Sequence, residues 1–260
     1  MKVDKFRTVI IYIIIILLGL VCLLPLLNIV AISFSSSAAV EGNMVGLIPV
    51  GFSTAAYEKI LEDSQFWHSF LISVERVVLT LIINFVLIVL MAYPLSKTNA
   101  QFRGRNIYAN LMIFAMLFNG GMIPTFLLVK SYGLLNTVWA LVLPGAVPIF
   151  NVILVMNFFA AVPKELEEAA FIDGANPLQV LTKIFIPISK PVLATVSLFS
   201  IVGSWNDFYS GLIYMSKAAY YPLMTYIQSL QINVEDLIKQ GNLSAVVDSA
   251  SLGNTNLNAA

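Results

Sequence analysis

The side chains that could do chemistry are few, and five of them are consecutive in one apolar stretch. They lie within residues 192–215 and are Trp205, Asn206, Asp207, Phe208 and Tyr209. A carboxylate and an amide can replace the water that a polyhydroxylated solute loses, and aromatic rings can stack on the apolar faces of sugars. Two interpretations stay open: a path for such a solute, or a belt of interfacial aromatic residues in which Asp207 pairs or caps locally.

A second group lies in the polar segment Pro163–Pro191. Pro163 suits the first turn of a helix, and Gly174 suits the left-handed end of that helix. Asn176 and Pro177 then have the residue types of a cap and first residue of another short helix. The sequence therefore predicts two short helices that meet at a turn within residues 163–190.

The charges of this segment indicate how it could be used. Glu165, Glu167 and Glu168 outnumber Lys164 in the first of its helices. A helix that only lies on lipid would favour Lys and Arg on its polar face. We therefore favour docking to a protein partner with basic residues over an amphipathic elbow that only lies at the membrane surface.

Other kinds of chemistry are excluded by what the sequence lacks. A zinc site needs three or four ligands, and the chain has one histidine, His68, and one cysteine, Cys22. A formal net charge of zero gives no reason to expect nucleic acid binding. The sequence contains no Gly-Lys dipeptide, and hence no Walker A loop for nucleotide phosphates. We expect a chain that is not an enzyme, with no catalytic residues, no metal and no cofactor of its own.

The elements that must position these residues are predicted to be membrane-spanning helices. The sequence is 59% hydrophobic and 11% charged, whereas an average soluble domain is about 25% charged. Apolar runs of spanning length lie at about 9–32, 70–95, 107–129, 137–159 and 192–215. Lys and Arg gather before the first run and in the loop after the second, which places both in the cytoplasm by the positive-inside rule.

Polar and helix-breaking residues inside the runs indicate a bundle with an interior surface. Pro144, Gly145 and Pro148 interrupt the fourth run beside Asn151. Such residues cost helix stability unless neighbouring helices satisfy the exposed groups. The candidate solute path therefore consists of one residue of the fourth run and four of the fifth: Asn151, Trp205, Asn206, Asp207 and Tyr209.

Two other features need neighbours as well. Glu75 and Arg76 are adjacent near one end of the second run, and we expect an interfacial position or an ion pair with a neighbouring helix. Asn119–Gly121 and Pro124 interrupt the third run. This break is either a turn where the helix ends or a stretch of free backbone that lines a cavity.

The spacing within the polar segment resembles a known motif. Glu168-Ala169-Ala170, three residues, Gly174, nine residues, Ile184, one residue and Ile186-Pro187 resemble the EAA loop of permease subunits of ATP-binding cassette importers. Other stretches are similar to the carbohydrate-uptake branch of that family and, within it, to the maltose permeases: Asp173-Gly174-Ala175, Trp205-Asn206-Asp207-Phe208 and Tyr221-Pro222-Leu223.

The resemblance implies an all-α polytopic membrane protein, a type I ABC importer permease bundle that forms a single domain over residues 1–260. It also implies a second homologous permease subunit, two cytoplasmic ABC ATPase subunits that bind ATP and Mg, and an extracellular or periplasmic solute-binding protein. The chain would lie in the bilayer of a bacterial or archaeal cytoplasmic membrane, with its N-terminus in the cytoplasm. The docking residues implied by the motif are Glu168, Ala169, Ala170, Asp173, Gly174, Ile184 and Pro187.

The family pattern has six spans, whereas the sequence shows five, and we expect a C-terminal sixth span to be missing from it. The cargo implied is a sugar, and the aromatic residues of the fifth run favour an oligosaccharide. The alternatives are an importer of the same architecture for another solute, such as an osmolyte or an amino acid, and an ion-coupled carrier or membrane scaffold.

Overall fold

A computed structural model describes residues 5–118 and 120–239, and within these ranges the chain is helical and has no β-strand. The first helices are α1 (Lys5–Ser33), α2 (Ser37–Glu41), α3 (Ala55–Glu62) and α4 (Ser64–Leu95). The middle ones are α5 (Arg105–Leu117), α6 (Met122–Ser131), α7 (Val138–Val142), η1 (Leu143–Gly145) and α8 (Ile149–Ala160). The remaining ones are α9 (Lys164–Ile172), α10 (Pro177–Val180), the π-helix η2 (Leu181–Phe185), α11 (Ile186–Ile188), α12 (Lys190–Asn206), α13 (Tyr209–Tyr214), η3 (Ala218–Tyr220) and α14 (Leu223–Lys239).

The chain divides into two compact units, Met1–Trp67 with Ile227–Ala260, and His68–Tyr226. In the first unit, the loop after α1 is tied to the end of that helix. Asn28 Nδ2 of α1 donates to the carbonyl oxygen of Gly46 at 2.7 Å. Phe34 stacks on Tyr57 of α3 with the ring centroids 4.9 Å apart.

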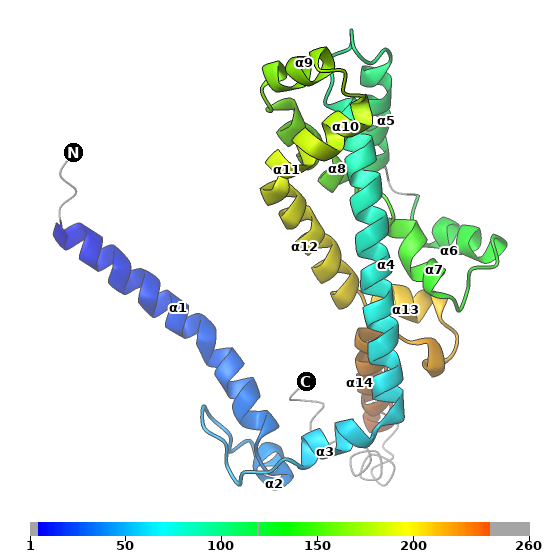
Figure 1. The fold of residues 1–260 in the computed structure, drawn as a ribbon. Coiled ribbons are helices and arrows are strands. Elements are labelled where there is room, and N and C mark those ends of the chain that lie inside the picture. Colours follow the sequence, from blue (N-terminus) through cyan, green and yellow to red (C-terminus); the bar gives the residue numbers. More distant parts are fainter. Residues whose placement is uncertain (1–4, 119, 240–260) are drawn as a thin grey trace. The chain divides into compact units, whose positions relative to one another are not determined.

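The second unit is built around α4, beside which α12 runs (Figure 1). The helices α9, α10 and α11 gather at the end of α4 that carries Leu95. The core at this end combines residues of four elements, each at most 3% exposed: Ile88 and Ala92 of α4, Val155 of α8, Phe185 of η2 and Val196 of α12. Burial of this apolar surface fixes α9 to α11 to the rest of the unit.

Among the described residues, two helices are long and apolar enough to cross a membrane, and up to five spans result if each bent helix pair counts as one. The single helices are α1 from Thr8 onward and α4. The pairs are α5 with α6, α7 and η1 with α8, and α10 to α11 with α12. The second pair bends by 48° between Gly145 and Ile149, where Pro148 cannot supply a helical N–H donor.

The fifth apolar run is not one helix, although its composition predicted a span as far as residue 215. Instead, α12 ends at Asn206, Asp207 has extended backbone with φ −78° and ψ 94°, and α13 follows separately. The Asp207 carboxylate accepts a hydrogen bond from the backbone N–H of Ser210 at 3.1 Å. This contact satisfies a donor in the first turn of α13 and so favours the break.

Two predicted features fall partly on residues that the structure does not describe. In the predicted break of the third run, Asn119 lies outside the described residues, and its neighbours Phe118 and Met122 are 67% and 50% exposed. Residues 240–260, which follow α14 in the region where the sequence showed no sixth apolar run, also lie outside them.

Candidate functional site

The predicted pair of short helices at 163–190 forms an elbow that local hydrogen bonds define. After α9, Gly174 adopts the left-handed conformation with φ +81°. The N–H of Ala175 donates to the carbonyl oxygen of Ala170 at 2.9 Å, and the N–H of Gly174 donates to that of Phe171 at 3.1 Å. These two bonds are the Schellman ending of a helix, which needs a left-handed residue and therefore favours glycine.

The second helix of the elbow begins with a capping box. The side chain of Asn176 accepts from the N–H of Gln179 at 2.9 Å, and the side chain of Gln179 accepts from the N–H of Asn176 at 2.9 Å. Pro177 occupies the first turn, as the sequence predicted. The helix then passes through the π-turn of η2 and ends before the buried Ser189, where it meets α12 at 84°.

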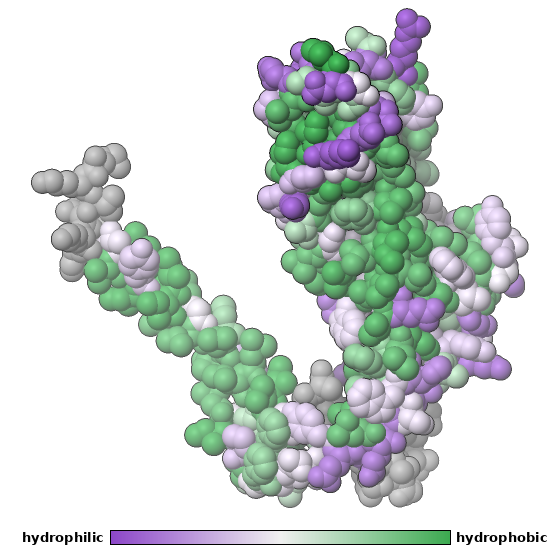
Figure 2. Space-filling model, in the orientation of Figure 1, coloured by the Kyte–Doolittle hydropathy of each residue, from purple (hydrophilic) through white to green (hydrophobic). Residues whose placement is uncertain are grey.

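The outer surface of the elbow combines acidic and apolar side chains. Glu168, Ala169, Asp173, Gly174 and Pro187 are exposed, whereas Ala170 and Ile184 are half-buried. Four apolar side chains are also exposed: Leu166 at 43%, Phe171 at 43%, Ile172 at 85% and Leu178 at 63%. Hydrophilic side chains gather over α9 and α10, in contrast to the hydrophobic surface along α4 (Figure 2). The elbow is thus a protrusion with both charge and apolar surface to offer a partner.

One glutamate of the elbow is used inside the chain. Glu167 Oε2 accepts from Lys97 Nζ at 2.7 Å, and the two side chains are 11% and 12% exposed. The Lys97 ammonium also lies 4.1 Å from the ring centroid of Tyr93 and 4.2 Å from that of Phe185. Burial lowers the pKa of Lys97 from its ordinary value, while the hydrogen bond and the charge of Glu167 oppose this shift. We call Lys97 and Glu167 the dry pair; with the two rings they join the end of α4 to α9 and η2.

One face of α4 changes from polar to apolar along its length. The residues buried on this face recur at intervals of three or four: Ser69, Ser73, Arg76, Thr80, Asn84, Ile88, Ala92 and Leu95. The first five are polar and the last three are apolar. A helix in an apolar solvent buries polar groups only where a neighbour or water can satisfy them. The polar half of the face therefore marks a second candidate site.

A cavity of about 270 Å³, lined by both polar and apolar side chains, lies against this half of α4. From α4 it is lined by Arg76, Thr80 and Asn84, and from α12 by Ser200 and Ser204. Asp207, Asn151 of α8 and the proline-interrupted stretch Pro144–Pro148 complete much of the wall. This arrangement agrees with the bundle-interior position predicted for the interrupted fourth run.

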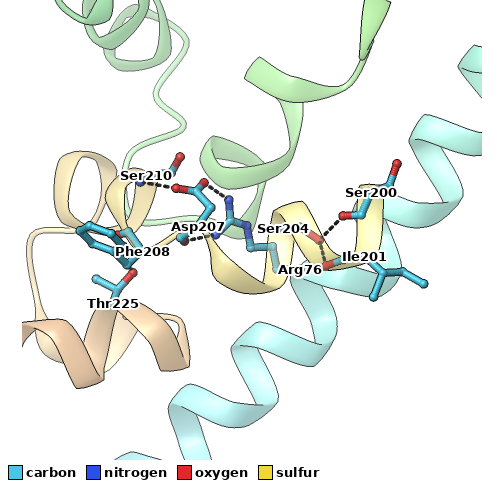
Figure 3. A network of polar contacts seen from close by, with 8 residues as sticks. All are labelled: Arg76, Ser200, Ile201, Ser204, Asp207, Phe208, Ser210 and Thr225. Carbon is cyan, nitrogen blue, oxygen red and sulfur yellow. Dashed lines mark hydrogen bonds and ion pairs between the residues drawn. The ribbon is translucent and has the colours of Figure 1, made fainter. Parts of the chain in front are cut away.

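An ion pair closes one part of this wall (Figure 3). The Arg76 guanidinium donates from Nη2 to the Asp207 carboxylate and from Nη1 to the Asp207 carbonyl oxygen at 2.8 Å. The Arg76 side chain is 4% exposed and that of Asp207 is 30% exposed. The neutralising partner expected for Arg76 is therefore Asp207, at the end of a neighbouring helix. We call these two residues the cavity pair.

The start of α14 supports the same corner. The N–H of Leu223 donates to Ser73 Oγ at 2.7 Å, and Thr225 Oγ1 donates to the carbonyl oxygen of Phe208 at 2.8 Å. A β-carbon on Gly211 would collide with the Thr225 side chain. The position of Asp207 is therefore held by contacts from α4, α13 and α14.

The structure brings together only part of the predicted solute path. Asp207 and Asn151 line the cavity. Trp205 packs edge-on against Phe70, with ring centroids 6.0 Å apart. Asn206 Nδ2 donates to the carbonyl oxygen of Val202 in its own helix, and the Tyr209 hydroxyl lies 3.0 Å from the sulfur of Met122. These three residues thus have contacts elsewhere in the second unit.

Of the polar residues that line the cavity from α4 and α12, sequence reasoning missed four: Thr80, Asn84, Ser200 and Ser204. The signal was their spacing, because polar residues four apart on an otherwise apolar helix share a face. In the part of the chain that the structure describes, no group of three or more His, Cys, Asp or Glu residues could hold a metal ion. The two candidate sites are the exposed elbow and the cavity beside α4.

Several known proteins are similar to this chain in sequence, and one solved structure is also similar to it in fold. The chain is 42% identical to Protein LplC of Bacillus subtilis (strain 168) over 214 residues, 82% of this chain and 72% of that protein. It is 39% identical to the polygalacturonan/rhamnogalacturonan transport system permease protein YtcP of the same organism, over 93% of this chain and 83% of that one. A solved bacterial ABC transporter involved in the import of the acidic polysaccharide alginate contains a chain with TM-score 0.83 and 31% identity, over 100% of this chain and 93% of that chain.

The fold predicted from the sequence is thereby confirmed as that of an ABC importer permease. Residues 84–247 match a family described as the binding-protein-dependent transport system inner membrane component. The match includes both the elbow and most of the cavity wall. The chain therefore belongs to the family of inner membrane components of binding-protein-dependent transport systems.

Proposed function

We propose that this chain is the transmembrane permease subunit of an ATP-driven, binding-protein-dependent importer of sugars, with oligosaccharides as cargo. The family consists of transport permeases that work with a partner ATPase and a solute-binding protein. Relatives support the cargo, since they include permeases named for polygalacturonan/rhamnogalacturonan, diacetylchitobiose and multiple sugars. A second homologous permease subunit and two cytoplasmic ATPase subunits complete the proposed complex, which binds ATP and Mg outside this chain.

The proposal rests on a difference in exposure between two glutamates of α9. Glu167 is buried against Lys97, whereas Glu168 is exposed beside Ala169 and the apolar side chains of Leu166 and Ile172. An exposed carboxylate next to apolar surface suits a basic cleft on a soluble partner. The ATPase subunits would hold α9 and α10 in such a cleft at the cytoplasmic face, with the N-terminus of the chain on the same side.

In the proposed mechanism, ATP binding and hydrolysis in the partner subunits move the elbow. The dry pair and the apolar core connect α9 and η2 to α4, α8 and α12. A packed core moves as a unit because its interior is not continuously deformable. Displacement of the elbow would therefore tilt these helices and switch the bundle between inward- and outward-facing states.

The test is a charge reversal at the exposed glutamate. Glu168→Lys should reduce ATPase association and uptake at least about tenfold, because a buried interfacial charge pair becomes a repulsion. Insertion into the membrane should be unchanged. The matched control is Glu165→Lys, which makes the same charge change at another exposed position of α9. Unaltered copurification of the ATPase with the Glu168→Lys chain would contradict the docking role, and uptake without any ATPase would favour an ion-coupled carrier.

A further inference from the structure

The cavity beside α4 has an unusual charge distribution for a polar compartment. Among the residues that line it, Arg76 and Asp207 carry formal charge, and they are bonded to each other. The Arg76 side chain is 4% exposed, and that of Asp207 is 30% exposed. A solute in the cavity would therefore meet hydrogen-bonding groups in a wall without net formal charge.

Two polar atoms of this wall have no hydrogen-bond partner within the described part of the chain. They are Arg76 Nε, a donor, and Asn84 Oδ1, an acceptor, on residues that are 3% and 4% exposed. Nearly all buried polar groups are paired with protein or water, and an unpaired one costs free energy. Both residues line the cavity, and these two atoms are themselves shielded from it.

The remaining polar groups of the wall are hydroxyls and amides. Asn84 Nδ2 donates to Ser200 Oγ at 3.2 Å, and Ser204 Oγ donates to the carbonyl oxygen of Ser200 at 2.7 Å. Asn151 is 6% exposed and adds a second amide. The wall thus combines donors and acceptors with apolar side chains around a volume of about 270 Å³, slightly below the about 300 Å³ at which the usual range of small-molecule sites begins.

We propose that this cavity is a subsite for an uncharged, hydroxyl-rich unit of the solute, such as one sugar ring, and that the cavity pair keeps it electrically neutral. The inference rests on the proposed function for the nature of the cargo. Asp207 presents acceptor oxygen to solute hydroxyls, while Arg76 acts as a positioning residue that cancels its charge. Removing either charge alone would give the compartment a field that favours ions of the opposite sign.

The test places a reporter thiol in the wall and does not depend on the identity of the cargo. Ser204→Cys is nearly isosteric and lies in the lining, and Cys22→Ser removes the native thiol. The purified complex, with cysteine-free partner subunits, is treated with methanethiosulfonates that carry a sulfonate, a trimethylammonium or an uncharged hexose. Rates are divided by those of free mercaptoethanol with the same reagents.

In the chain with the intact cavity pair, the hexose reagent should react, and the anionic and cationic reagents should have normalised rates within about threefold of each other. Asp207→Asn should shift the anion-to-cation ratio upward by on the order of tenfold, and Arg76→Gln should shift it downward by a similar factor. The double variant Arg76→Gln with Asp207→Asn should restore the original ratio. Arg76→Lys, which keeps the charge, should leave it unchanged and controls for loss of folding.

Three results would overturn the inference. The first is no reaction with the hexose reagent where the small charged reagents react, and the second is a tenfold preference for one charged reagent in the intact chain. The third is an anion-to-cation rate ratio that is the same in both single variants as in the intact chain. None of these results depends on ATPase docking or on sugar uptake. Failure of the proposed function would instead appear as a normal reporter pattern in a complex that takes up no sugar.

Discussion

The two buried ion pairs of the second unit use similar chemistry in different surroundings. One joins the residues just after α4 to α9, and the other joins α4 to the end of α12. Arg76 and Lys97 are separated by on the order of 30 Å along the helix direction. Aromatic rings and the apolar core surround the dry pair, Lys97 with Glu167. A cavity with unsatisfied polar atoms surrounds the cavity pair, Arg76 with Asp207.

This difference teaches that the role of an ion pair depends on what surrounds it. At the dry pair, two aromatic rings flank the ammonium and both side chains are nearly buried, so the pair serves to hold helices together. At the cavity pair, the Asp207 side chain stays 30% exposed and lines the cavity. The first pair therefore acts as a joint, in the sense that it holds helices together next to the elbow. The second pair is part of the cavity surface that a solute can contact.

The largest effect on stability should follow from breaking the ion pair between Lys97 and Glu167. Glu167→Ala leaves the Lys97 ammonium buried without its partner, and loss of one member of a buried pair costs about 3 kcal/mol of unfolding free energy. The thermal unfolding midpoint of the purified chain measures this loss. Glu165→Ala, on the exposed side of α9, should change stability by less than about 0.5 kcal/mol. Equal effects of the two variants would show that the dry pair is not a joint.

Replacing both members of each pair by apolar residues sharpens the comparison. Lys97→Met with Glu167→Leu should keep uptake near its original rate, because well-packed apolar residues can substitute for a buried ion pair and methionine packs well on aromatic rings. Arg76→Leu with Asp207→Leu should lower uptake about tenfold, a barrier increase of about 1.4 kcal/mol. Uptake in reconstituted vesicles is the measurement. Similar losses in the two double variants would remove the distinction between joint and solute surface.

The smallest effect should come from the turn of the elbow. Gly174→Ala places a β-carbon at φ +81°, where no other atom lies within 4 Å, so the cost is backbone strain of about 1 kcal/mol. We expect weaker ATPase association with normal membrane insertion, measured by copurification. Gly19→Ala is the control, since it lies in α1 with open space around it and no positive φ. A neutral result at Gly174 would mean that the elbow tolerates another turn.

The elbow could be predicted almost completely, whereas the cavity could be predicted only in part. The hydrogen bonds around Gly174 and the Asn176-Pro177 cap span five residues or fewer, so the residue types alone predict the local backbone structure. Trp205 and Tyr209 were grouped with Asp207 because they are close in sequence, yet Trp205 packs on Phe70 instead. Proximity along a helix does not decide which face a side chain occupies.

By itself, the sequence determined the membrane-spanning class, the elbow with its exposed acidic surface, and the family motif. These follow from composition, periodicity and local hydrogen bonding, which act over short distances along the chain. Only the tertiary structure decided which charges neutralise each other: Lys97 with Glu167, 70 residues apart, and Arg76 with Asp207, 131 residues apart. Such pairing depends on which helices pack side by side, and no spacing within a single helix encodes it.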